Sequence, residues 1–273
     1  MERVKCLLCN RENFDSYIEV NNRFSPIESF NIVKCECSFI FLNPRPDINE
    51  ISSYYNHLSY TPHKNSDSFL YRIAQFLSFK WKIRIISKYF NKSKKVLDFG
   101  SGSGKFTNFI KINGFNAYSL DPFIKSDYSS LEEILVDNKK FDAITMWHSI
   151  EHLHDLSSLI IEVKNILKNS GKLFIAIPNH NAIERKYFNE DWIAYDAPRH
   201  LYHFNYSTVK LFLEKNNIKV VKVYRMYLDT IYNILYSKSS YNFFYKIFII
   251  IKSIFKIFIN KEVSSSILIV CKK

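Results

Sequence analysis

The chain has 273 residues, of which 47% are hydrophobic, and this composition is typical of a soluble globular protein with its own core. Residues 1–9 are polar and carry two cysteines, which excludes a secretory signal peptide, so we expect a cytoplasmic protein with reduced cysteines. A surplus of 38 basic over 26 acidic residues gives a net charge of +12. That charge favours anionic partners without choosing among nucleic acid, phosphorylated small molecules and an acidic membrane surface.

Residues 1–45 are predicted to form a small module that carries four of the five cysteines and ends in the proline-rich sequence NPRPD. Cys6-x-x-Cys9 and Cys35-x-Cys37 form two close pairs, which predicts one structural zinc ion held by four thiolates. The second pair is one residue shorter than the usual spacing, so buried free cysteines remain the alternative. The fifth cysteine, Cys271, is expected in core packing.

Residues 46–93 are predicted to be a linker followed by a lead-in helix, because apolar residues recur at helical spacing over 68–90. Residues 94–273 are predicted to form the main domain. We expect its strands at 94–100, 116–121, 141–147, 172–178, 218–225 and 265–273, and its helices at 105–114, 156–171 and 207–217. Gly114 and Gly171 are expected to end the first two of these helices. The alternation predicts a doubly wound α/β sheet with parallel strands.

Between the last two strands, segment 226–262 is predicted to be an amphipathic helical insertion. On a helical projection Lys252, Ser253, Lys256 and Asn260 share one side, and the other side carries Phe244, Ile247, Ile251, Phe255 and Phe258. The lysines exclude a transmembrane span. We expect the apolar side to pack on the domain or in a homodimer interface, and the alternative is peripheral membrane contact through 241–260.

Glycine is scarce, with five residues in the chain, and Gly100, Gly102 and Gly104 fall within five positions between a strand and a helix. Such a turn lets backbone N–H groups approach a ligand closely. The next strand ends at Asp121, where a carboxylate can accept hydrogen bonds from ribose hydroxyls. Asp98, just before the turn, would repel a pyrophosphate and suits a cofactor with a positively charged amino group. The predicted cofactor-binding residues are therefore Asp98, Gly100, Gly102 and Asp121.

This pattern resembles the class I S-adenosylmethionine-dependent methyltransferases over residues 94–224. The resemblance rests on VLDFGSGSG (96–104), Asp121, FDAI (141–144) with the following WHSIEHL, and SGKLFIAIPN. Within that superfamily, the chain is similar to the branch in which Glu-His follows strand four, which includes ubiquinone-pathway O-methyltransferases and many sugar methyltransferases. The resemblance implies a seven-stranded Rossmann-like sheet that ends in an antiparallel hairpin. Only 20 residues separate Asp121 from Asp142, fewer than the family pattern uses for its adenine-contacting segment.

The sequence WHSIEHL also contains His148, Glu151 and His152 at the H-x-x-E-H spacing of one zinc peptidase class. A peptidase needs these residues on one helix, whereas here they leave a strand directly, so we reject that interpretation. Three alternatives remain open. The Glu-His pair caps a helix; His148 or His152 is a general base on an acceptor hydroxyl; or His148, Glu151 and His152 hold a divalent cation, as the ubiquinone-pathway resemblance implies.

A second loop, DWIAYDAPRHLYHFN, follows strand five and offers His200 as a further base and Tyr195, Arg199 and His203 as acceptor-binding residues, unless it is only a packed loop. An N-terminal zinc-binding segment before such a domain resembles bacterial enzymes of surface-polysaccharide modification. We therefore expect O-methylation of a small saccharide-linked or phosphorylated acceptor. The alternatives are a zinc-ribbon RNA methyltransferase, disfavoured because no basic, aromatic-interleaved face is evident, and a non-catalytic cofactor-binding scaffold.

Overall fold

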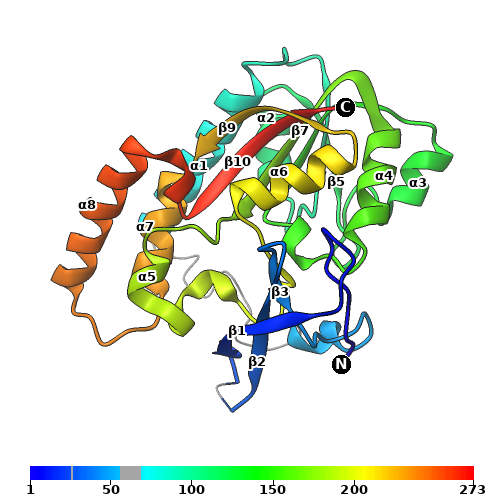
Figure 1. Cartoon of the computed structure of the whole chain (residues 1–273). Coiled ribbons are helices and arrows are strands. Elements are labelled where there is room, and N and C mark those ends of the chain that lie inside the picture. Colours follow the sequence, from blue (N-terminus) through cyan, green and yellow to red (C-terminus); the bar gives the residue numbers. More distant parts are fainter. Residues whose placement is uncertain (26, 56–68) are drawn as a thin grey trace.

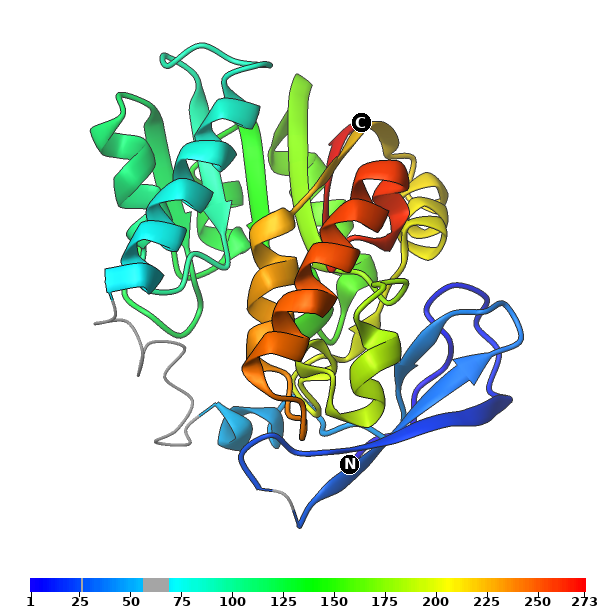
Figure 2. The same ribbon diagram turned by 90° about the vertical axis from the view of Figure 1, so that its left-hand side faces the viewer.

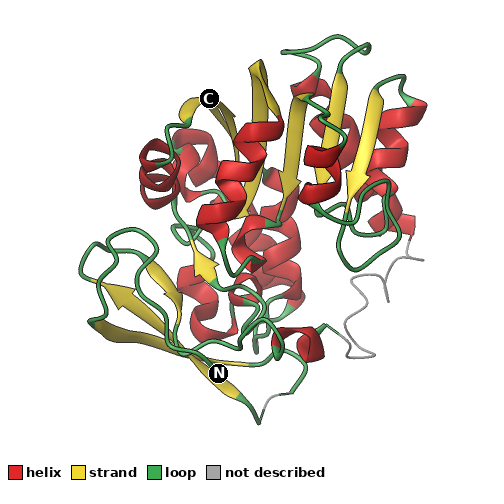
Figure 3. Cartoon of the chain, turned by 90° about the vertical axis from the view of Figure 1, so that its right-hand side faces the viewer, coloured by secondary structure: helices red, strands yellow, loops and turns green. Residues whose placement is uncertain are grey.

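The computed structural model describes residues 1–25, 27–55 and 69–273. Residues 56–68 lie outside the described residues. They belong to the predicted segment 46–93 and include residue 68, the first of the predicted lead-in helix. The chain forms a large sheet flanked by helices and a small sheet near the N-terminus (Figure 1). Figure 3 shows the two sheets as separate sets of strands, with the small one beside the ends of the large one.

The large sheet has six strands in the order β5-β4-β6-β7-β10-β9. Their bounds are Lys95–Phe99 (β4), Asn116–Leu120 (β5), Phe141–Trp147 (β6), Leu167–Pro178 (β7), Lys219–Arg225 (β9) and Ser266–Lys272 (β10). Strands β5, β4, β6 and β7 are parallel, whereas β10 runs antiparallel to both of its neighbours. This arrangement confirms the predicted Rossmann-like methyltransferase sheet with its closing antiparallel hairpin.

The seventh strand of the expected sheet is reduced to a single bridge in the described residues. Leu120 pairs in parallel with Tyr128, outside any longer strand, at the free edge of β5. The short helix α3 (Leu131–Val136) follows at once. The 20-residue spacing noted in the sequence therefore leaves room for a bridge and one short helix where the family pattern has a full strand.

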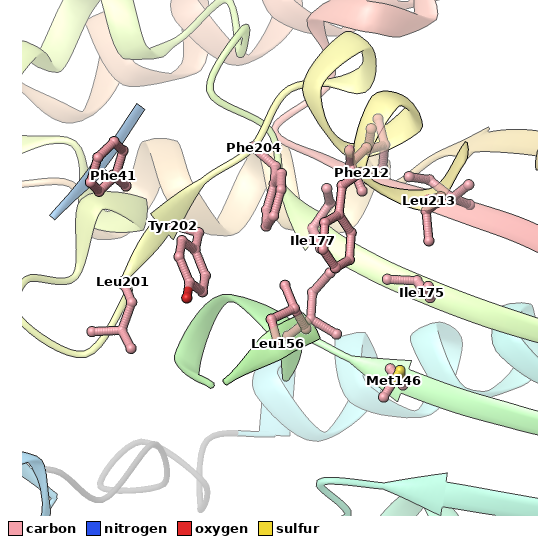
Figure 4. Close-up of a cluster of buried hydrophobic side chains, with 14 of the residues drawn as sticks. Phe41, Met146, Leu156, Ile175, Ile177, Leu201, Tyr202, Phe204, Phe212 and Leu213 are labelled. Carbon is pink, nitrogen blue, oxygen red and sulfur yellow. The ribbon is translucent and has the colours of Figure 1, made fainter. Parts of the chain in front are cut away.

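Helices cover both faces of the large sheet because its strands are apolar on both sides. Val96, Ala143 and Phe174 face α1 (Phe69–Ile86) and α2 (Lys105–Ile112) in one cluster of buried residues. Their chain neighbours Leu97, Ile144 and Ile175 face the other side, with α3, α4 (Leu156–Ile166) and α6 (Tyr206–Lys215). Figure 4 shows this second cluster, which runs from Met146 and Ile175 through Phe212 toward Tyr202 and Phe41.

The predicted helix over 156–171 ends earlier, at Ile166, and Leu167 already begins β7. Leu167 is fully buried and pairs with Phe141, so core packing overrides the helical pattern of the lysine-rich end. Gly171 does not end a helix. A Cβ atom on Gly171 would lie 2.7 Å from Cδ1 of Leu167, so this glycine makes room for that buried side chain. Gly114, with φ +88°, follows α2 as predicted.

The small sheet has the order β1-β2-β3-β8, and its members are β1 (Phe14–Asn21), β2 (Ser29–Cys35), β3 (Ile40–Leu42) and β8 (Tyr202–His203). The first three strands lie within residues 1–45, but β8 comes from the loop that follows β7. Phe41 of β3 pairs with Tyr202 of β8, and both side chains belong to the cluster in Figure 4. The cysteine module is thus joined to the main domain through a shared sheet.

The insertion 226–262 forms two helices, α7 (Tyr227–Tyr236) and α8 (Phe243–Ile259), which pack against each other. Figure 2 shows α8 lying along the outer side of α7. The packed side of α8 differs from the expected one, because Ile249, Ser253 and Ile257 are buried. A further short helix, α5 (Arg185–Phe188), precedes the second loop.

Candidate active site

The glycine turn connects β4 to α2 and contains three left-handed positions. These positions alternate along the turn: Gly100, Gly102 and Gly104 have φ values of +66°, +52° and +69°, which other residues rarely adopt. A Cβ atom on Gly100 would lie 2.6 Å from the hydroxyl oxygen of Ser149. The turn therefore brings its backbone against the loop that follows β6, and glycine is needed at position 100 for two independent reasons.

The two predicted acidic residues hold this turn from either side. Asp98 is buried, and each of its carboxylate oxygens accepts a 2.8 Å hydrogen bond, one from the hydroxyl of Thr107 and one from that of Thr145. Burial raises its pKa, although these hydroxyls favour the ionised form. Asp121 ends β5, and its Oδ2 accepts the Gly102 N–H at 2.8 Å. The structure thus places Asp98 beneath the turn and Asp121 beside it, at the carboxyl edge of the sheet.

His148 follows β6 directly and lies between two carboxylates. Its Nε2 is 3.0 Å from Asp229 Oδ2, and its Nδ1 is 3.4 Å from Glu151 Oε1. Burial alone favours the neutral ring, but the two carboxylates prevail and raise the pKa of His148 to about 9. A ring that is already protonated near neutral pH cannot accept a proton. This environment disfavours the predicted role of His148 as a general base.

Because His148 is charged between two carboxylates, we expect the stability of the fold to depend on pH. The pKa of His148 is about 9 in the folded chain, whereas an ordinary histidine has a pKa of 6.5. The stabilisation of the fold by the charged ring is therefore fully present below pH 6.5 and is lost as the pH rises to about 9. We expect the free energy of unfolding to fall more steeply over this range in the wild type than in His148→Gln. Denaturant titrations at pH 6.5 and pH 9 measure the difference. Equal slopes in both proteins would contradict the buried ion pairs.

Glu151, His152 and His200 form a second group, whose ligand atoms lie within 4.8 Å of one another. His152 Nδ1 is 3.0 Å from the Arg199 carbonyl oxygen, and His200 Nδ1 is 2.8 Å from that of Ala194. Because these contacts occupy the Nδ1 atoms, the Nε2 atom of each ring is the one left to bind a ligand. The Glu151 side chain is buried, and neither of its oxygens accepts a hydrogen bond from the part of the chain that the structure describes.

This group differs from the predicted cation site, because His200 takes the place of His148. His148 is charged by its two carboxylate neighbours and cannot ligate a metal in that state. In contrast, burial and the nearby His200 ring lower the pKa of His152 to about 4, which keeps it neutral. The neutral His152 ring and the His200 ring each have Nδ1 on a carbonyl oxygen and lie beside a buried carboxylate, and this set of groups fits a divalent cation.

A cavity of about 410 Å³ opens beside these histidines. Its walls include His148 and His200, the aromatic side chains Tyr71 and Phe79 of α1, and Asp229 and Tyr232 of α7; Arg23, from the turn between β1 and β2, also lines it. His148 is followed in the chain by Ser149, which contacts Gly100. The glycine turn and the cavity therefore share one wall, made by two consecutive residues.

The three predicted acceptor-binding residues do not line this cavity. The guanidinium of Arg199 is fully buried, donates to Asp196 and reaches the Tyr54 carbonyl oxygen. Tyr195 and His203 pack against each other with ring centroids 5.3 Å apart, and burial raises the pKa of Tyr195 to about 12. These side chains stabilise the loop and the small sheet. Their acceptor-binding role stays a prediction that these contacts do not support, because the aromatic and basic composition of the loop does not reveal that it is buried.

Sequence reasoning missed Arg23, Asp229 and the aromatic walls of the cavity. Asp229 lies in the helical insertion, 81 positions from its partner His148, and no local pattern links the two. Arg23 is an isolated arginine in a turn of the cysteine module. Both reach the site only because α7 and the small sheet fold against the end of the large sheet.

The four predicted metal ligands of the N-terminal module come together. Sγ atoms of Cys6 and Cys37 are 3.5 Å apart, those of Cys9 and Cys35 are 3.4 Å apart, and all four lie within 4.8 Å of one another. In a tetrahedral zinc site with Zn–S bonds of about 2.3 Å, neighbouring sulfurs are about 3.8 Å apart. Despite burial, hydrogen bonds from Arg11 N–H and the nearby thiols lower the pKa of Cys9 to about 7. This geometry fits a structural zinc ion, and the short second spacing does not prevent it.

Comparisons with known proteins identify the family. A family model described as a methyltransferase domain matches residues 69–223. The chain is 24% identical over 173 residues to an uncharacterized protein of Methanocaldococcus jannaschii, covering 59% of this chain and 76% of that one. It is 31% identical over 104 residues to the ubiquinone biosynthesis O-methyltransferase of Pelagibacter ubique, covering 32% of this chain and 43% of that enzyme.

Solved structures share the fold. A methyltransferase structure from Galdieria sulphuraria superposes with a TM-score of 0.50 at 14% identity, covering 74% of this chain and 88% of that one. An S-adenosylmethionine-dependent methyltransferase from Archaeoglobus fulgidus has a TM-score of 0.49 at 22% identity, and the match covers 73% of this chain and 94% of that one. The family model spans more than half of the 273 residues and includes the glycine turn, Asp121 and His148. The chain therefore belongs to this methyltransferase family, and it is an S-adenosylmethionine-dependent methyltransferase.

Proposed function

We propose that the chain transfers the methyl group of S-adenosylmethionine to a hydroxyl oxygen of a small saccharide-linked or phosphorylated acceptor, with His200 as the general base. The observation that carries this proposal is the shared wall between the glycine turn and the cavity. His148 lines the cavity and Ser149 contacts Gly100, so a cofactor on the turn and an acceptor in the cavity would meet at these two residues.

His200 suits the role of base better than the other two predicted histidines. His148 is protonated, as its raised pKa requires, and His152 does not line the cavity. His200 lines the cavity, and its Nδ1 contact with the Ala194 carbonyl oxygen leaves Nε2 unprotonated in the neutral ring. In the transfer, Nε2 takes the acceptor hydroxyl proton, the oxygen forms a bond to the methyl carbon, and the carbon–sulfur bond breaks to release neutral S-adenosylhomocysteine.

The residues that line the cavity support this acceptor class. Arg23 is an exposed cation at its wall and can pair with a phosphate or carboxylate. Tyr71, Phe79 and Tyr232 supply aromatic surface, and Asp229 and Asn233 supply polar groups for hydroxyls. The net charge of +12 also favours an anionic acceptor. Similarity to a ubiquinone biosynthesis O-methyltransferase supports oxygen as the methylated atom.

A second candidate for acceptor activation is a divalent cation held by Glu151, His152 and His200. The observation that favours it is the cluster itself, because ligand atoms of Glu151, His152 and His200 lie within 4.8 Å of one another around a buried carboxylate. When bound, such a cation would lower the pKa of an acceptor hydroxyl. Glu151 and His152 would then hold the ion, while His200 would serve as a ligand in place of its role as base.

Replacing His200 by asparagine tests the proposal. We expect His200→Asn to lower kcat by about 10²-fold or more, because a general base contributes that much, while cofactor affinity stays unchanged. Release of S-adenosylhomocysteine is measured with a panel of nucleotide sugars and sugar phosphates. The matched control is His154→Gln, whose ring contacts the Pro46 carbonyl oxygen away from the cavity.

The same assay separates the two candidates for activation. If His200 acts as a base without a cation, activity should survive prolonged dialysis against a chelator too weak to strip thiolate-bound zinc. Loss of activity on dialysis, restored by added Mg²⁺ or Mn²⁺, would favour the cation. Full activity in His200→Asn would contradict both.

A further inference from the structure

Helix α8 carries apolar residues on two opposite sides. One side, with Ile249, Ile250 and Ile257, is buried against the rest of the chain, including α7. The other side consists of Phe244, Phe248, Ile251, Phe255 and Phe258, and we call it the α8 stripe. Its residues follow one another at steps of four and three, so they form a single line along the helix.

The α8 stripe is open to solvent. Its five side chains are between 52% and 82% exposed, and the neighbouring Phe243 and Ile259 are exposed as well. From Phe244 to Phe258 the line is about 21 Å long, since an α-helix rises about 1.5 Å per residue. Soluble proteins rarely leave so large a contiguous aromatic surface uncovered unless another surface binds it.

The charges around the stripe are of one sign. Residues 230–261 contain five lysines and no aspartate or glutamate. Lys252 and Lys256 are exposed on α8 itself, one helical turn apart along the edge of the stripe. An apolar face bordered by lysines matches the surface of an anionic bilayer, in which acyl chains receive the aromatic rings and headgroups pair with the ammonium groups.

We propose that α8 docks this enzyme on an anionic lipid surface, with the stripe inserted into the boundary between headgroups and acyl chains. The same charges oppose an antiparallel two-fold dimer of this chain as the occupant, because that pairing would bring the lysine edges of both copies together. No helix among the residues that the structure describes is long and apolar enough to cross a membrane. The helix therefore lies on the surface.

The inference does not depend on the acceptor or on the base. Helix α7, on which α8 packs, supplies Asp229 and Tyr232 to the cavity wall, so docking would hold the enzyme to the membrane through a helix next to its acceptor site. Cofactor binding by the glycine turn and docking by the stripe are separate properties. Each can fail without the other.

Vesicle flotation with the full chain tests the proposal. We expect the wild type to float with vesicles of phosphatidylcholine and phosphatidylglycerol and to bind phosphatidylcholine alone much more weakly. The double variant Phe255→Ser/Phe258→Ser should bind about tenfold or more weakly, because two exposed rings no longer enter the bilayer. Lys252→Glu/Lys256→Glu should lose the preference for phosphatidylglycerol.

The control is Ile112→Ser/Val136→Ser, which removes two apolar side chains that are each 85% exposed but lie on α2 and α3. It should bind vesicles like the wild type. Wild-type protein that does not float with anionic vesicles would overturn the proposal, as would equal binding by the serine variant of α8. A wild-type dimer in sedimentation that becomes a monomer in that variant, with no vesicle binding, would assign the stripe to a second copy. Cofactor titration of each variant shows whether the fold is intact.

Discussion

Asp121→Asn is expected to weaken binding of S-adenosylmethionine by about a hundredfold or more. One oxygen of Asp121 accepts the Gly102 N–H, and the other accepts the N–H groups of Phe123 and Ile124. An amide can accept on only one side, so the variant loses part of this scaffold together with the charge that the ribose hydroxyls need. Hydrogen bonds to a charged group contribute about 1.5–3 kcal/mol each, and two of them account for the expected loss. Calorimetric titration measures it.

Asp127→Asn is the matched control for this experiment. Asp127 lies six positions further along the chain and accepts hydrogen bonds from Ser119 and Lys111, not from the glycine turn. The Asp127→Asn variant should bind the cofactor with the same affinity as the wild type. Thermal unfolding of both variants shows whether a loss of binding reflects a loss of fold. Unchanged affinity in a folded Asp121→Asn would remove Asp121 from the cofactor site.

Loss of the thiolate cluster is expected to have the second large effect. Purified protein should carry zinc, and Cys6→Ser should lose it and be destabilised by about 3 kcal/mol or more, because structural zinc supplies about 10 kcal/mol or more to small thiolate modules. Methyl transfer should fall too. The small sheet holds β8, which follows His200 by two residues, and the turn between its first two strands carries Arg23.

Metal analysis and thermal unfolding, with and without a strong chelator, test this expectation. The control is Cys271→Ala, a buried cysteine in β10 far from the cluster in sequence, which should keep its zinc. Wild-type protein that contains no zinc, and whose unfolding does not respond to the chelator, would show that the four thiols are only packed together.

The parts of the fold that could be predicted are those marked by patterns within a short stretch of sequence. The glycine turn, Asp98 and Asp121 lie within 24 residues, and each belongs to a strand end that the apolar pattern marks. The Rossmann-like sheet was predictable for the same reason. The end of α4 was not, because Leu167 and Lys168 continue the helical pattern after Ile166, and only the burial of Leu167 against Phe141 draws the segment into β7.

The acceptor side of the site was less predictable because it is built from distant segments. His148 owes its charge in part to Asp229, in an insertion for which the sequence pattern predicted packing, a dimer interface or membrane contact and no part in the site. The acceptor-binding role predicted for Arg199 failed since Asp196, three positions away, occupies its guanidinium. The helical projection of α8 placed four of the five stripe residues on its apolar side, with Ile247 in place of Phe248, and it did not reveal their environment, because periodicity does not tell a buried face from an exposed one.

A crystal structure of the enzyme with S-adenosylhomocysteine would test most directly whether the cofactor and the acceptor meet at residues 148 and 149. We expect the ribose on Asp121 and the sulfur against residues 148 and 149, directed into the cavity that His148 and His200 line. A sulfur directed away from that cavity, or a cofactor that avoids the glycine turn, would contradict the shared wall on which the proposed transfer depends.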